Sequence, residues 1–244
     1  MKQIKFSICT ASLFMLMSCV DLNLNPLSEG SSENWYSSQA EIEMSLNDFY
    51  RTDFFPIDDM KWGDDVTARN ETSAVNNGTL TSEDGTIAKR WENYYKGIAR
   101  ALRIINNMDR ARAMGVSERD IAQYEGEAYF YLGYAYGMLA FHWGDAILDK
   151  VGMSLDEAYT ASRSPKADVL AYSYECLDKA AERLPNSYPG IQRATKGAAY
   201  AFKARIAIYN EDYAAAATAA KNCMDLNVYK LHSNYQDLFT ASWS

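Results

Sequence analysis

The chain has 244 residues, of which 48% are hydrophobic and 23% are charged, and its formal net charge is −8. This length and composition fit one globular domain with a buried core. The negative charge argues against binding to nucleic acid or to an anionic membrane surface, because those partners are negatively charged too.

The first eighteen residues have the form of a bacterial lipoprotein signal peptide. Lys2 and Lys5 precede an apolar run that is too short to span a bilayer, and this run ends in the lipobox Leu16–Cys19. The order of basic, apolar and small residues before the cysteine predicts that Cys19 is lipidated and becomes the first mature residue. The alternative is an ordinary signal peptide with an incidental cysteine. A lipid on Cys19 would anchor the protein without a transmembrane helix.

The residues after the signal divide into a tether and a helical domain. Residues 19–34 are polar and are expected to link the lipid to the folded part. Residues 35–244 carry helical patterns and no convincing β pattern, which predicts an all-α domain. In its first helix, Ser38 and Glu41 have the spacing of a capping box, and Pro56 is the expected stop.

A long polar segment from Asp58 to Asp84 interrupts the helical pattern. Loops of this length inside a compact domain are usually functional or disordered, so we expect a ligand-binding surface here. Trp62 offers an indole face to a sugar ring, and nearby asparagines offer amides to its hydroxyls. The candidate ligand-binding residues are Trp62, Asn70, Asn76 and Asn77. The alternative is that Trp62 only packs the loop onto the scaffold.

No cofactor is predicted. Four aspartates in the polar segment offer the oxygen ligands that calcium prefers, but a solvated acidic loop is the favoured interpretation because their spacing is not that of an EF-hand. These are Asp58, Asp59, Asp64 and Asp65. No Cys-x-x-Cys or Cys/His cluster gives a zinc signature. Cys176 and Cys223 are expected to be buried free thiols, with a disulfide between them as the alternative.

Helical spacing returns at Trp91 and continues to Met108, with Gly115 as the expected stop. The next helix is expected to be capped by Ser117 and to end at Gly144, and the rest of the chain is organised around it. Its apolar face mixes large rings with glycine and alanine. Because glycine costs roughly 1 kcal/mol relative to alanine inside a helix, its repeated use predicts tight packing against neighbouring helices.

The second half of the chain continues with helices. Ser154 begins a possible short helix, and Ser164 with Pro165 predicts the next start, with serine as N-cap and proline at the first helical position. Thr195 and Asp212 are the expected caps of the last two helices, whose alanine spacing is that of a tetratricopeptide-like unit. The predicted fold class is therefore all-α, with tetratricopeptide-like antiparallel helical pairs and long irregular loops.

Several residues of types that often act in catalysis or ligand binding are assigned structural roles. Trp91 and Trp143 occupy apolar helical positions and are expected in the core. Glu125 and Glu127 are two residues apart on a helix, so they point in different directions and cannot act as a pair. His142 has no nucleophile placed with it to suggest a triad. With no recognisable pair of carboxylates for glycoside hydrolysis either, the chain is predicted not to be an enzyme.

A set of short motifs occurs in a characteristic order along the chain. They are Leu16–Cys19, Trp91–Ile98, Ile104–Asn106, Gly126–Phe130, Trp143–Asp145, Arg163–Pro165, Leu184–Pro185, Thr195–Ala199, Lys203–Arg205 and Tyr229–Leu231. Together they resemble the SusD/RagB family, the nutrient-binding surface lipoproteins of Bacteroidota. The resemblance covers nearly the whole chain.

The resemblance implies a helical scaffold that caps a SusC-like TonB-dependent transporter. It implies a lipid-anchored protein of the outer membrane that faces the cell exterior, binds a glycan or another nutrient, and delivers it to the channel without catalysis. Family members are usually longer, so the domain is expected to be truncated at its C-terminal end. A second departure is Ala146, which follows Asp145 where the family often has proline.

Two alternatives stay open at this point. The ligand of such a protein is a peptide in some relatives rather than a sugar, and the sequence does not identify the glycan. A purely structural helical-repeat lipoprotein that mediates protein–protein assembly in the envelope is the rival function, because helical repeats bury their faces by stacking on neighbours.

Overall fold

The computed structural model describes residues 35–56 and 74–236. The chain divides into two units, residues 1–35 and 36–244, and all the described helices belong to the second. Within the described residues there is no β-strand, only one isolated β-bridge between two connecting segments. The all-α prediction is confirmed.

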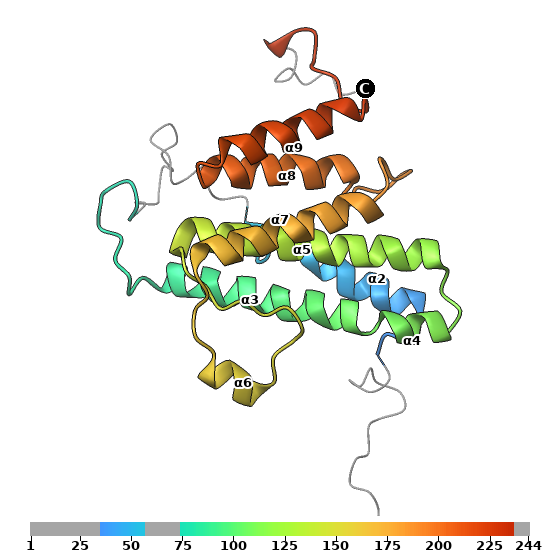
Figure 1. Cartoon of the computed structure of the whole chain (residues 1–244), viewed down its shortest axis with the longest axis horizontal. Coiled ribbons are helices and arrows are strands. Elements are labelled where there is room, and N and C mark those ends of the chain that lie inside the picture. The colour runs from blue at the N-terminus through green and yellow to red at the C-terminus, as the bar shows by residue number, and fades with distance from the viewer. Residues whose placement is uncertain (1–34, 57–73, 237–244) are drawn as a thin grey trace, which may run out of the picture. The chain divides into compact units, whose positions relative to one another are not determined.

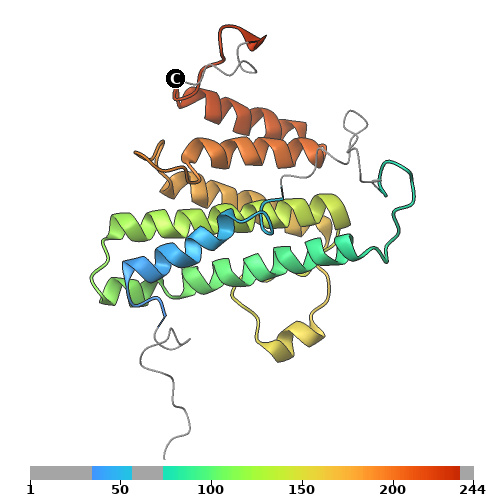
Figure 2. The same ribbon diagram turned by 180° about the vertical axis from the view of Figure 1, so that it is seen from behind.

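The helices of this unit stack around α5. In chain order they are α2 (Gln39–Asn47), the 3-10 helix η2 (Asp48–Tyr50), α3 (Gly85–Asn106), α4 (Met108–Ala113), α5 (Glu118–Trp143), α6 (Leu155–Thr160), α7 (Lys166–Arg183), α8 (Lys196–Tyr209) and α9 (Tyr213–Asp225). Figure 1 shows α3 along one side of α5, with α7, α8 and α9 following on the other. Seen from behind, α2 lies across α5 (Figure 2).

The glycines of α5 are the points where other helices come closest. A Cβ added to Gly133 would lie 2.5 Å from Cγ of Leu177 on α7, and one added to Gly137 would lie 2.5 Å from Cδ1 of Ile206 on α8. Gly126 faces the C-terminal end of α7 in the same way, at 3.0 Å. The predicted close approach of neighbouring helices to the central helix is confirmed.

The predicted N-caps of four helices are also confirmed. The side chains of Ser38, Ser117, Thr195 and Asp212 each accept a hydrogen bond from the backbone N–H three residues further on. Each satisfies one of the backbone donors that a helix start leaves unpaired. The helix that follows Ser154 is likewise present and starts with a capping box.

Two boundaries differ from the sequence prediction. The first helix ends at Asn47 and continues only as the short η2, so it stops well before Pro56. The second begins at Gly85 rather than at Trp91, because the Asp84 side chain caps it there. The apolar pattern starts later than the helix itself since the first two turns of α3 are largely exposed.

The prediction that Ser164 is the N-cap of the next helix is wrong. Ser164 is paired with Ala146 by two backbone hydrogen bonds of 2.8 and 3.2 Å, and α7 begins only at Lys166. Pro165 takes the N-cap position, where it has no side-chain oxygen to offer. Instead, Oδ1 of Asp145 accepts from the Lys166 N–H at 2.8 Å. The cap therefore comes from the turn that follows α5.

The last two helices form the predicted tetratricopeptide-like pair. Ala204 on α8 and Ala216 on α9 are 9% and 6% exposed, as expected for close-contact positions. The two helices are joined by a short turn and run side by side (Figure 1). Large apolar side chains of the same two helices, including Ile208 and Met224, are exposed.

Candidate ligand-binding site

Part of the predicted ligand-binding set lies outside the described residues. This applies to Trp62 and Asn70, to the four loop aspartates, and to Cys19 at the predicted anchor. Among the described residues, no group of three or more His, Cys, Asp or Glu side chains is placed to hold a metal ion. None of the helices in the same ranges has the length and apolar character needed to cross a membrane.

Asn76 and Asn77 belong to an exposed turn that precedes α3. The turn is closed by the carbonyl oxygen of Ala74, which accepts from the N–H groups of Thr79 and Leu80 at 2.9 and 3.0 Å. Both asparagines are thus displayed to solvent on a hydrogen-bonded turn, at the end of the predicted ligand-binding loop. This placement suits contact with a large external ligand.

A second part of the site was not predicted: an aromatic pocket of about 320 Å³ beside the start of the same loop. The residues that line this pocket are Tyr50, Phe55, Phe130, Gln192, Arg193, Ala194 and Phe202. Phe130 meets Phe55 in a stacked arrangement at 6.0 Å and Phe202 edge-on at 5.3 Å. The walls are therefore rings held in place by one another, with polar groups of the 192–194 segment beside them.

A buried ion pair positions the polar side of the aromatic pocket. Glu127 on α5 is only 2% exposed, and its Oε2 accepts from Nη1 of Arg193 at 2.9 Å and from the Tyr50 hydroxyl at 2.8 Å. The Tyr50 oxygen in turn accepts from the Ala194 N–H at 2.9 Å. Arg193 also donates through Nη2 to Oδ1 of Asn47. Three segments that are far apart in sequence are tied together by this network.

Burial dominates the electrostatics of these groups. It raises the pKa of the Glu127 carboxyl, while the charge of Arg193 and the hydrogen bond from Tyr50 oppose that rise. Burial and the Glu127 charge both raise the pKa of Tyr50 well above its ordinary value, so its hydroxyl stays protonated and donates. The two hydrogen bonds to one carboxylate oxygen and the charge of Arg193 limit this rise, although the pKa of Glu127 remains raised.

The two neighbouring glutamates of α5 have separate partners, as predicted. Glu125 pairs with Arg112 at 3.2 Å and with Arg183 at 3.3 Å, whereas Glu127 points to Arg193. Sequence reasoning dismissed Glu127 as half of a catalytic pair but missed its role at the pocket. The available signal was that Glu127 directly precedes the apolar run Ala128–Phe141, where a buried carboxylate needs a partner.

Trp91 and Trp143 are only half-buried, so their predicted place in the core is not what the structure shows. Their rings meet edge-on at 5.4 Å, and the guanidinium of Arg163 lies 5.0 Å from the Trp91 ring. They pack the N-terminal half of α3 against the C-terminal end of α5. This is a packing role at the edge of the scaffold.

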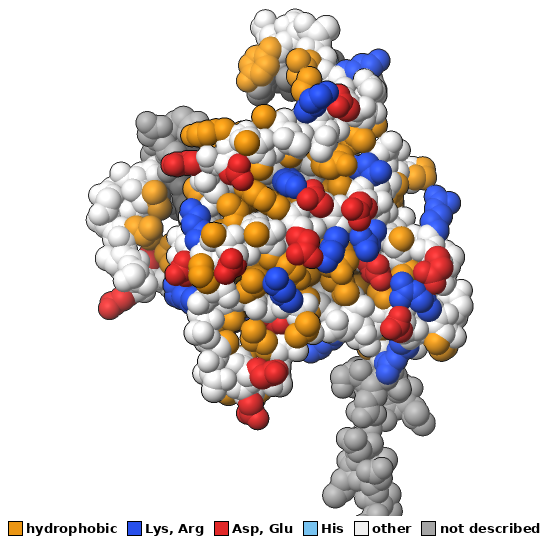
Figure 3. Space-filling model, in the orientation of Figure 1, with side chains coloured by type: hydrophobic (Ala, Val, Ile, Leu, Met, Phe, Trp, Pro, Cys, Tyr) orange, Lys and Arg blue, Asp and Glu red, His pale blue; other side chains and the backbone are white. Residues whose placement is uncertain are grey.

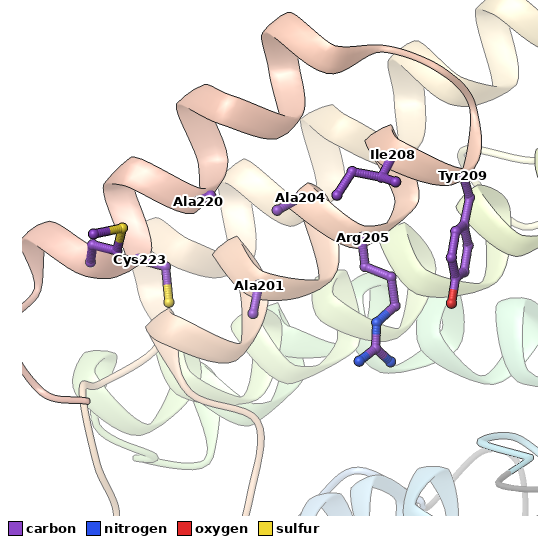
Figure 4. A pocket seen from close by; sticks show the side chains of 8 residues that line it. Ala201, Ala204, Arg205, Ile208, Tyr209, Ala220 and Cys223 are labelled. Carbon is purple, nitrogen blue, oxygen red and sulfur yellow. The ribbon is translucent and has the colours of Figure 1, made fainter. Parts of the chain in front are cut away.

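A second hollow of about 420 Å³ lies between α8 and α9. This apolar groove is lined by Ala201, Ala204, Arg205, Ile208, Tyr209, Ala220, Cys223 and Met224. Figure 4 shows Arg205 and Tyr209 extending from α8 on the same side, away from α9. Most of its lining is aliphatic, and Tyr209 is the one ring among these described lining residues, whereas four rings line the aromatic pocket.

Acidic and basic side chains are interspersed on the face that carries α3, α5 and α7 (Figure 3). Exposed ion pairs occur on these helices, such as Lys89 with Glu92 on α3 at 3.1 Å. Exposed pairs of this kind contribute little stability, typically up to about 1 kcal/mol each. On this face the charges largely compensate one another and do not create a field of one sign.

Comparison with known families gives a direct match. The model of a SusD-like family described as "Starch-binding associating with outer membrane" matches residues 30–208. SusD-like protein P2 of Formosa agariphila is 23% identical over 253 residues, which cover 94% of this chain and 48% of the relative. SusD-like protein P38 of the same organism is 26% identical over 243 residues, covering 93% and 47%. The chain spans about half the length of these curated relatives.

Solved structures show the same fold. A SusD-like carbohydrate-binding protein from Bacteroides fragilis superposes with a TM-score of 0.71 at 23% identity, over 84% of this chain and 44% of its own. A SusD homologue from Bacteroides thetaiotaomicron gives 0.70 at 21% identity, over 84% and 44%. A structure solved with xylogluco-oligosaccharide gives 0.64 at 18% identity, over 82% and 43%. The helical stack around α5 is thus shared with these proteins.

Proposed function

Because the chain belongs to the SusD-like family, which is described as starch-binding and associated with the outer membrane, we propose that it is a non-catalytic glycan-binding lipoprotein. In this proposal a lipid on Cys19 holds the protein on the outer face of the outer membrane. The protein binds an oligosaccharide there and passes it to a SusC-like TonB-dependent transporter.

The aromatic pocket carries this proposal. Its volume of about 320 Å³ is within the usual range for small-ligand sites, roughly 300–1,000 Å³. Rings such as Phe55 and Phe202 offer apolar faces to a pyranose, and the exposed amide of Gln192 can bond to its hydroxyls. In the sequence, Phe55 is the last aromatic residue before Trp62, the ring predicted to contact the glycan.

The carboxylate nearest to the pocket supports binding without bond cleavage. Glycoside hydrolysis needs one carboxyl group to protonate the leaving oxygen and a second one across the cleft. Glu127 is buried and engaged by Arg193 and Tyr50, so it is not available to protonate a glycosidic oxygen. We expect no reducing ends to be released from any glycan that binds.

Calorimetry tests the binding proposal directly. The full chain carrying Cys19→Ser, which prevents lipidation, is titrated with oligosaccharides of starch, xyloglucan and mannan. We expect binding to at least one of them, and at least ten-fold weaker binding in Trp62→Ala and Gln192→Ala. Tyr159→Ala is the matched control, because this tyrosine is 80% exposed on α6 and remote from the lining residues. Failure to bind any glycan would reject the proposal.

The proposed partner needs a separate experiment. Affinity-tagged protein is purified from detergent-solubilised outer membranes of the host, and co-purifying proteins are identified by mass spectrometry. We expect a TonB-dependent transporter in stoichiometric amount. Its absence would reject delivery to a channel while leaving glycan binding untouched.

One observation favours a second function, a structural lipoprotein for protein–protein assembly. The apolar groove on α8 and α9 exposes Ile208 and Met224 by 55% and 76%, and exposed apolar patches commonly mark protein contacts. Under this alternative, Ile208→Ser would reduce recovery of envelope partners and Trp62→Ala would not. Glycan binding that depends on Trp62 and Gln192 would favour the proposed function over this structural alternative.

A further inference from the structure

The charge of the aromatic pocket is unusual for its composition. Among the described residues that line it, Arg193 is the one with a charge at neutral pH. A free arginine at such a place would attract carboxylate or sulfate groups, which its planar donors fit well. Here Nη1 donates to Glu127 and Nη2 to Asn47, so two of its nitrogens already have partners within the protein.

The surrounding carboxylates more than balance this cation. Glu127 contacts Arg193 directly, and Glu43 on α2 lies near enough to act on both of them. The Glu43 carboxylate is itself fixed, because Oε1 accepts from the Tyr124 hydroxyl at 2.9 Å. One positive charge therefore faces two negative charges. Because Glu127 and Arg193 are largely buried, salt screens their interaction much less than that of exposed pairs.

We propose that the aromatic pocket selects neutral sugar units and discriminates against units that carry a carboxylate or a sulfate. This inference rests on the proposed function, because it specifies the glycan that the same site accepts. An anionic unit in the pocket would lose its hydration. The one charged side chain among the described lining residues, Arg193, is already paired, and Glu127 and Glu43 would repel the anion. A neutral unit needs only ring contacts and hydrogen bonds, which the pocket offers.

The test compares each neutral glycan with its own oxidised form. Oligosaccharides of starch, xyloglucan and mannan are oxidised at their free C6 hydroxyl groups, which converts primary alcohols to carboxylates and leaves the linkages unchanged. Both forms are titrated into the full chain carrying Cys19→Ser. We expect the preferred neutral form to bind at least ten-fold tighter than its oxidised form, and Gln192→Ala to weaken that neutral binding.

Each outcome of this comparison has a separate meaning. Equal or tighter binding of the oxidised form would overturn the inference and leave the proposed function standing. Neutral binding that Gln192→Ala does not weaken would also overturn it, because the glycan would then lie elsewhere. No binding of either form would reject the proposed function itself. None of these results depends on a variant at the buried ion pair.

A substitution at that pair adds a stricter test. Glu127→Gln removes the balancing charge while keeping the shape of the side chain, so Arg193 becomes available to an anion. We expect the affinity of the oxidised form relative to the neutral form to rise at least five-fold, and this gain to shrink at high salt. Glu125→Gln is the matched control on the same helix, because its partners Arg112 and Arg183 do not line the pocket. An unchanged ratio in Glu127→Gln would contradict the inference.

Discussion

Two cysteines of the helical domain lie in surroundings that give them different reactivities. Cys176 on α7 is fully buried, and burial raises the pKa of its thiol to about 12. Cys223 on α9 is half-buried, with its Sγ 3.5 Å from the carbonyl oxygen of Gly197. Both are free thiols, as predicted, although only Cys176 is fully buried. Since the thiolate is the reactive form, access and pKa both protect Cys176.

We therefore predict selective labelling by a disulfide reagent. In mature protein carrying Cys19→Ser at pH 8, Cys223 should react and Cys176 should stay unlabelled until denaturant is added. The variant Cys223→Ser should show no reactive thiol when native and one when denatured. Labelling is followed by absorbance and located by peptide mass spectrometry. Equal rates for the two thiols in the native protein would contradict the buried position of Cys176.

At the scale of helices, the packing of α5 on α7 depends on a position that has no room for a side chain. A Cβ at Gly133 would lie 2.5 Å from Leu177 Cγ and 2.9 Å from the backbone oxygen of Ser173. Because that oxygen belongs to the helix backbone, the contact cannot be relieved by a rotamer change alone. The same helix contact includes a hydrogen bond of 2.6 Å that the Ser173 hydroxyl donates to the backbone oxygen of Gly133.

Gly133→Ala is expected to lower the free energy of unfolding by about 2 kcal/mol, because the close contact with the helix backbone puts the overpacking cost near the top of its usual range. Overpacking usually costs about 1–3 kcal/mol, whereas the gain in helix propensity from glycine to alanine is only about 1 kcal/mol. Gly85→Ala at the start of α3 is the control, since nothing lies within 4 Å of its added Cβ. Chemical denaturation monitored by circular dichroism measures both. A Gly133→Ala protein as stable as the control would argue against this close helix contact.

The start of α7 gives a second prediction for a single element. Asp145 caps this helix from the turn after α5, so Asp145→Ala should lower the free energy of unfolding by about 1 kcal/mol, as loss of an N-cap typically does. Asp145→Asn keeps an acceptor oxygen at the same place and should retain most of that stability. Denaturation curves of the three proteins provide the comparison. Equal losses in both variants would show that charge, and not capping, is the important property.

These elements show which features the sequence could predict. The caps at Ser117 and Thr195 were predictable because a capping side chain and the backbone N–H that donates to it lie three residues apart. The glycines of α5 were predictable because their spacing is helical. The cap from Asp145 reaches a backbone 21 residues away, and the pair Glu127–Arg193 joins residues 66 apart. No local pattern marks such contacts, so the polar side of the aromatic pocket could be found only after folding. The roles of Trp62 and Asn70 stay predictions.

At the scale of the whole molecule, the family to which the chain belongs is described as associating with the outer membrane. In the proposed function, a tether from a lipidated Cys19 links the helical domain to that membrane. The family match begins at residue 30, which is near the predicted end of the tether at residue 34. The helical domain would then sit outside the bilayer with its binding surface free for a glycan and a transporter.

Cys19→Ser is expected to move the protein from the membrane fraction to the soluble fraction of the host. The native protein should stay in the pellet after a carbonate wash, because its acyl chains are buried in the bilayer and each CH₂ contributes about 0.8 kcal/mol. Incorporation of a fatty-acid analogue, read by gel fluorescence, should be lost in the same variant. Cys223→Ser is the control and should remain lipidated and membrane-bound. A Cys19→Ser protein that still resists carbonate extraction would mean that the attachment does not depend on this lipid, and would favour a tight protein partner as the anchor.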